Sequence, residues 1–72
     1  MTTESQEVMR LLNKHGGAAY ALTNLPLGYI FDNLSARAFT VLANALIAAD
    51  AEHPDVRGDE WLAAVGRNIE EV

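Results

Sequence analysis

Two histidines, His15 and His53, are the only imidazole side chains in a chain of 72 residues that contains no cysteine. The lack of cysteine excludes disulfides, thiolate zinc sites, iron–sulfur clusters and cysteine nucleophiles. Neither histidine has a second histidine or a carboxylate four residues away, the spacing that places two metal ligands on one face of a helix. His53 lies in the acidic stretch 50–55, which has the composition of a solvated linker. We therefore expect no metal-ligating residue and no cofactor.

Three short motifs match functional signatures but also have ordinary structural interpretations. Residues 57–59 (Arg-Gly-Asp) spell the tripeptide that integrins bind, yet a glycine followed by acidic residues is also a common way to begin a helix. Residues 33–35 (Asn-Leu-Ser) match the acceptor motif for N-glycosylation, which has meaning only in a secreted chain. The glycine pair at 16–17 could offer free amides to an anion, but glycines more commonly end a helix. Because the chain also lacks a nucleophile elbow and a phosphate-binding loop, we expect no catalytic residue and no enzymatic activity.

Ten acidic and five basic side chains give a net charge of −5, which opposes binding to a phosphate backbone. Residues 50–72 contain seven of the acids and only two arginines. Such a surface could imitate nucleic acid, although solvated helix faces have the same composition. Residues 18–34 have the outline of a helix-turn-helix, but the segment 27–34, where a recognition helix would lie, contains no basic residue. A DNA-binding regulator and an acidic DNA-mimic inhibitor are therefore alternatives to the function predicted below, and nucleic acid is the less favoured partner.

Capping residues, glycines and prolines divide the chain into helices. Thr3 and Gln6 have capping-box spacing at the start of the first helix, and Ser35 stands where the longest helix begins. Residues 26–34 are too few for periodicity to separate helix from strand, and we choose helix because no second strand is available for pairing. The helices are expected at about 4–15, 18–24, 27–33, 35–52 and 59–71.

These elements predict an all-α fold, a small single-domain bundle (residues 1–72) of three main helices with one or two short helical segments between them. At 100° per residue, Phe39, Leu42 and Leu46 share one face of the longest helix. The last helix is amphipathic, and its apolar stripe consists of Trp61, Leu62, Val65, Ile69 and Val72. We expect the aromatic side chains in the core, and a partner-binding groove formed by them is the alternative. The predicted core residues are Leu11, Leu12, Phe39, Leu42, Leu46 and Leu62.

Half of the 72 residues are hydrophobic, but twelve of these are alanine, so the core is thin. A chain of this length buries only about 60% of the surface that its unfolded form exposes, and association often reinforces domains of this size. The longest helix has apolar residues on nearly every side, and so short a chain has too few other elements to cover all of this apolar surface. We therefore expect a homodimer. The predicted interface with a second copy or another protein consists of Val41, Asn44, Ile47, Ala48, Trp61, Val65 and Ile69.

The predicted function is that of a small, acidic, non-enzymatic protein–protein interaction module that self-associates through its long central helix and acts as an adaptor, inhibitor or regulatory subunit. A small molecule held between subunits is a third interpretation, because oligomer interfaces form concave apolar pockets. Residues 1–7 have no signal-peptide pattern. The longest uncharged runs, 16–31 and 38–49, are shorter than the roughly 20 apolar residues of a membrane-spanning helix. We therefore expect a cytoplasmic location without membrane contact.

Overall fold

The computed structural model describes residues 2–71 and contains five helices and no strand in that range. The helices are α1 (Thr3–Lys14), α2 (Ala18–Asn24), α3 (Leu27–Asp32), α4 (Ala36–Glu52) and α5 (Asp59–Glu70). The all-α prediction is confirmed, including the helix chosen for residues 27–33, and each helix begins and ends within one residue of its expected range. Val72, expected in the apolar stripe of the last helix, lies outside the described residues.

The cap of α1 lies one residue before the expected position. The Thr2 hydroxyl accepts the backbone N–H of Ser5 at 3.1 Å and lies 3.0 Å from the Ser5 hydroxyl. The capping box predicted for Thr3 and Gln6 is wrong, because Thr3 is already helical and only Thr2 has the extended backbone that a cap requires. Ser35 caps α4 as predicted, since its hydroxyl accepts the N–H of Ala38 at 3.3 Å.

The turn between α1 and α2 depends on two glycines with positive φ, Gly16 at 99° and Gly17 at 101°. Residues with a Cβ rarely adopt this backbone conformation, so glycine is required here. The Gly17 N–H donates to the carbonyl oxygen of Leu12 at 2.9 Å and closes the last turn of α1. The turn redirects the chain so that α2 packs against α1.

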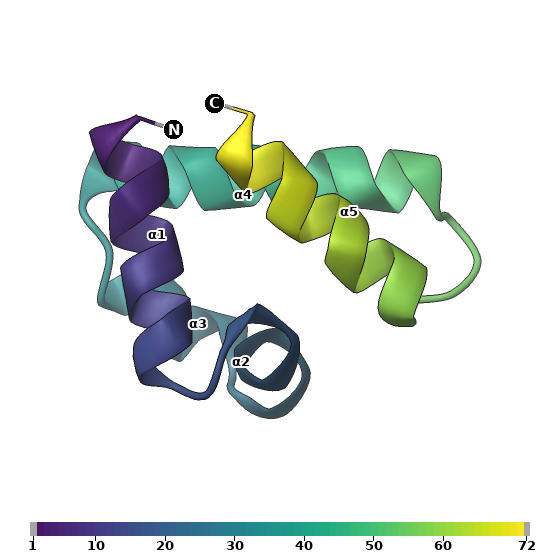
Figure 1. Ribbon diagram of the computed structural model, residues 1–72, viewed down its shortest axis with the longest axis horizontal. Helices are drawn as coiled ribbons and strands as arrows, with labels where there is room; N and C mark the ends of the chain where they lie inside the picture. The colour runs from purple at the N-terminus through teal and green to yellow at the C-terminus, as the bar shows by residue number, and fades with distance from the viewer. Residues whose placement is uncertain (1, 72) are drawn as a thin grey trace.

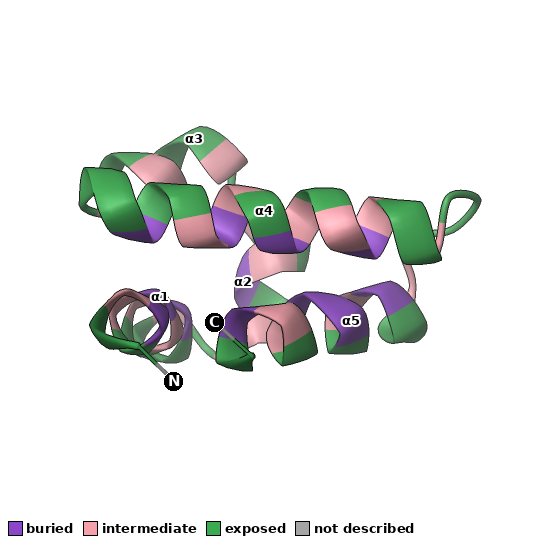
Figure 2. Cartoon of the chain, turned by 90° about the horizontal axis from the view of Figure 1, so that it is seen from above, coloured by how far each residue is buried: buried purple, intermediate pink, exposed green. Residues whose placement is uncertain are grey.

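α4 is the longest helix and runs along the top of the molecule in the view of Figure 1. α1 and α5 both pack against the same side of α4, and α5 makes the more extensive contact (Figure 2). α2 contacts α1 and α5, while α3 places Phe31 against Phe39 of α4, with ring centroids 4.3 Å apart. The buried hydrophobic core draws on all five helices and consists of Val8, Leu12, Ala21, Ile30, Ala38, Leu42, Ala45, Ala49, Trp61, Ala64, Val65 and Ile69.

The predicted core is correct for Leu12 and Leu42, which are fully buried, and needs correction elsewhere. Leu11, Leu46 and Leu62 are only partly buried at the edge of the core. Phe39 is 45% exposed and is not a core residue. The buried face of α4 is centred on alanines and Leu42, and at 100° per residue it is rotated by about one-sixth of a turn from the predicted face. α5 packs against this alanine-rich face, whereas Phe39 lies beside it and pairs with Phe31 of α3.

Candidate interaction surface

The outward face of α4 is the side opposite its buried residues Ala38, Leu42, Ala45 and Ala49. Its central residues, Ala36, Thr40, Ala43, Asn44, Ile47 and Ala51, carry no charge, and the exposed Arg37 lies at its border, about 20° around the helix from Asn44. All of these are exposed except Ala43, which is half-buried, and Ile47 is 66% exposed. In Figure 2, the exposed and half-buried residues of α4 lie toward the viewer, and the buried residues lie along the edge that faces α1 and α5. α4 therefore presents a surface whose centre is uncharged along the length of the helix.

The N-terminal end of α4 is anchored to α1 by a carboxylate. Ser35 donates its backbone N–H to Glu7 Oε2 at 2.7 Å and its hydroxyl to Glu7 Oε1 at 3.0 Å. In an ordinary capping box, an acid three residues after the cap accepts the N–H of the cap residue, but that position in α4 is Ala38. Glu7 supplies this acceptor from another helix. The sequence offered one signal, the missing acid at Ala38, but no way to find its replacement 28 positions earlier.

The C-terminal end of α4 is anchored to α5 and to the connecting segment by two acids. Asp50 accepts a hydrogen bond from the Trp61 indole at 2.8 Å and one from Arg57 at 3.1 Å. Glu52 accepts one from Arg67 at 2.6 Å and one from Asn68 at 3.3 Å. With both ends held, α4 displays its outward face from a fixed position.

The residues predicted for an interface separate into two groups. Trp61, Val65 and Ile69 are buried between α4 and the rest of the chain, so they contact the chain's own core and offer no surface to a partner. That part of the prediction is corrected: these three residues of α5 are buried within the chain, where α5 packs against α4, and are not available to another molecule. Asn44 and Ile47 are exposed on α4.

The two other residues predicted for the interface, Val41 and Ala48, are half-buried. Together with Asn44 they line a shallow hollow of about 280 Å³ beside the C-terminal end of α5, where Asn68 and Glu71 form the opposite wall. The structure therefore brings Val41, Asn44 and Ala48 together, and Ile47 lies on the same helix one turn after Asn44.

Several aromatic side chains expected in the core lie at the surface. Tyr20 packs over the turn at Gly16, and Tyr29 meets the ring of His15 edge-on with centroids 5.4 Å apart. Both tyrosines are exposed, whereas Trp61 is buried as expected. Tyr20 of α2 thus contacts the turn after α1, and Tyr29 of α3 contacts His15 at the end of α1. His15 is half-buried.

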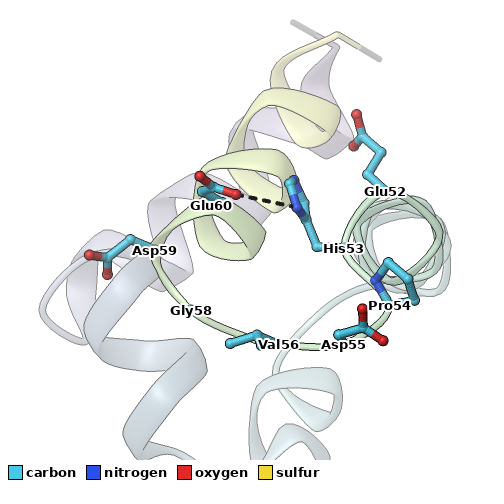
Figure 3. Close-up of a pocket in the computed structure, with 8 residues that line it drawn as sticks. All are labelled: Glu52, His53, Pro54, Asp55, Val56, Gly58, Asp59 and Glu60. Carbon is cyan, nitrogen blue, oxygen red and sulfur yellow. Dashed lines mark ion pairs between the residues drawn. The ribbon is translucent and has the colours of Figure 1, made fainter.

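The connection between α4 and α5 contains a hollow of about 410 Å³ that His53 lines (Figure 3). His53 Nδ1 lies 3.7 Å from Glu60 Oε2, and the two side chains point toward each other. The carboxylates of Glu52 and Asp59 are directed away from His53 (Figure 3). Within residues 2–71, no three His, Asp or Glu side chains come close enough together to hold a metal ion. The acids of this segment therefore do not converge on a common point.

The region with a helix-turn-helix outline does form two consecutive helices, α2 and α3. α3 has only six residues, and its exposed side chains include Tyr29 and Asp32 but no base. Among residues 2–71, no helix has the length and apolar character needed to cross a bilayer.

With the fold and this surface described, comparison with known proteins identifies no relative: no protein-family model, no curated protein and no solved structure matches the chain significantly.

Proposed function

We propose that the protein is a non-enzymatic interaction module that forms a homodimer through the outward face of α4. The observation that carries this proposal is the exposure of Ile47, 66% of whose surface is open to water on a helix face without charges. A solvent-facing helix surface normally carries charged and polar residues. Burying apolar side chains stabilises an association by about 25 cal/mol for each Å² removed from water.

The residues around Ile47 favour close packing of another helix. Ala36, Ala43 and Ala51 have small side chains, so the backbone of a second helix can approach α4. The fixed ends of α4 reduce the entropy lost on binding, because the surface is already in its bound conformation. In this proposal the dimer acts in the cytoplasm as an adaptor, inhibitor or regulatory subunit.

Two variants with the same change in charge test this proposal by size-exclusion chromatography with light scattering. Ile47→Asp places a carboxylate at the proposed interface, whereas Val56→Asp places one at a 70% exposed position in the connection between α4 and α5. We expect the unaltered chain and Val56→Asp to approach the mass of two chains at high concentration, and Ile47→Asp to stay at one. Circular dichroism should give the same helix content for all three. A dimer that survives Ile47→Asp would contradict the proposed surface.

A further inference from the structure

The charges of α4 are separated between its two ends. Arg37 is the only basic residue of the helix and lies in its first turn, while Asp50 and Glu52 lie in its last turn, with no charge between residues 38 and 49. Arg37 is exposed, and it makes no ion pair or hydrogen bond with any of residues 2–71. It is therefore a cation available to a partner, next to the uncharged outward face.

We propose that the second copy packs on α4 in the antiparallel direction, an inference that rests on the self-association proposed above. Asp50 and Glu52 already pair with Arg57 and Arg67 of their own chain, but Asp55, Asp59 and Glu60 follow, so this end of α4 keeps a net negative charge. An antiparallel pair places Arg37 of each copy beside this acidic end of the other copy, and the two-fold symmetry repeats the contact. A parallel pair would bring arginine against arginine and acids against acids, which destabilises an interface. The proposed partner is a second copy of this chain because, in the antiparallel direction, the basic start of each α4 lies beside the acidic end of the other.

The side chains of the outward face also have complementary sizes when two copies of α4 pack in the antiparallel direction. With the two-fold axis between residues 43 and 44, Ala36 lies opposite the partner's Ala51, and Thr40 lies opposite the partner's Ile47. Ile47, the largest exposed side chain of this face, thus packs at a position where the partner has a smaller one. Ala36 and Ala51 of one chain are separated by 15 residues, which is about 22 Å along the helix at 1.5 Å per residue. This separation makes the direction of packing measurable.

Single cysteines provide the test, because the chain has none of its own. The variants are Asn44→Cys near the axis, Ala36→Cys and Ala51→Cys at the two ends, and Thr23→Cys on the exposed surface of α2 as a collision control. They are treated with a short bismaleimide whose spacer is well below the separation of Ala36 and Ala51, and the products are separated on a denaturing gel. We expect Asn44→Cys to cross-link with itself, and Ala36→Cys to cross-link with Ala51→Cys when the two are mixed. Ala36→Cys alone and Ala51→Cys alone should not exceed the Thr23→Cys control.

The outcomes separate the direction of packing from self-association itself. Cross-linking of Ala36→Cys with itself and of Ala51→Cys with itself would overturn the antiparallel arrangement and retain the dimer. A mixed pair no stronger than the control would also overturn the arrangement, provided that the unaltered chain still sediments as a dimer. If no variant exceeds the control and the unaltered chain sediments as a monomer, both this inference and the proposed function fail.

A pair of charge reversals tests the role of Arg37 independently. Arg37→Glu and Arg10→Glu change the net charge equally, but Arg10 lies on α1. Because the symmetric contact occurs twice, Arg37→Glu should raise the dissociation constant of the dimer about tenfold, and Arg10→Glu should raise it less than about twofold. Equal effects of the two reversals would show that only total charge matters and would overturn the proposed contact.

Discussion

The Trp61 indole donates a hydrogen bond to Asp50 Oδ1 at 2.8 Å and joins α5 to the last turn of α4. Arg57, from the connecting segment, donates to the other oxygen of Asp50 at 3.1 Å and stands over the Trp61 ring, 5.0 Å from its centroid. One carboxylate thus receives two donors and closes the α4–α5 hairpin. Since Trp61 is only 4% exposed, its N–H has little access to water as an alternative acceptor.

Replacing Asp50 by alanine should therefore destabilise the fold. We expect Asp50→Ala to lower the free energy of unfolding by about 1–3 kcal/mol, because a buried donor loses its acceptor. Urea denaturation followed by circular dichroism measures this loss. In a Trp61→Phe background, where the donor is already absent, Asp50→Ala should cost less. Equal costs in the two backgrounds would show that the hydrogen bond to Trp61 does not stabilise the hairpin.

The contact between Glu7 and Ser35 should stabilise the start of α4. Glu7→Ala removes the acceptor of two hydrogen bonds and should lower the free energy of unfolding by about 1–2 kcal/mol. Gln6→Ala is the matched control, since Gln6 is the exposed neighbour of Glu7 on α1 and should change stability by less than about 0.5 kcal/mol. If the two variants unfold at the same urea concentration, the carboxylate contributes nothing measurable to the cap.

Leucines on α4 should differ in their importance for stability. Leu42 is fully buried and Leu46 only partly, so Leu42→Ala should cost about 2–5 kcal/mol and Leu46→Ala clearly less. Thermal unfolding at a concentration where each variant is monomeric measures the order. A larger loss for Leu46→Ala than for Leu42→Ala would place the buried face of α4 where the hydrophobic periodicity predicted it.

Two glycine substitutions should have effects of opposite sign. A Cβ at Gly17 meets no atom within 4 Å, so the cost of Gly17→Ala comes from its backbone, whose φ of 101° disfavours alanine by about 1–3 kcal/mol. A Cβ at Gly66 is equally free of contacts, but Gly66 lies inside α5, where alanine should stabilise the helix by about 0.5–1 kcal/mol. Urea midpoints compare the two variants directly. A Gly17→Ala variant as stable as the unaltered chain would contradict the conformation of this turn.

Local signals in the sequence predicted the helices well. Glycines 16 and 17, Pro26 and Ser35 each act over a few residues, and each marks an end or a beginning that the structure retains. The error at the first cap is also local: Thr2 and Thr3 are both good capping residues, and the capping-box spacing of Thr3 and Gln6 favoured the wrong one.

The buried faces were harder to predict because they depend on which helices meet. Hydrophobicity favoured Phe39 as a core residue, yet the side of α4 that is buried carries mainly alanines, and Phe39 pairs with Phe31 near the surface. Val65 and Ile69 of α5 are fully buried in the core. The apolar pattern of α5 alone could not show whether these residues face the core or an interface. The contact between Glu7 and Ser35 joins residues from different helices, and no local rule indicates it.

The most direct test of the central claim is sedimentation equilibrium of the unaltered chain over a range from micromolar to millimolar concentration. If α4 presents Ile47 and its uncharged neighbours to a second copy, the average mass must rise with concentration from that of one chain toward that of two. A folded chain that keeps the mass of a single copy throughout this range would contradict the claim that the outward face of α4 is a self-association surface.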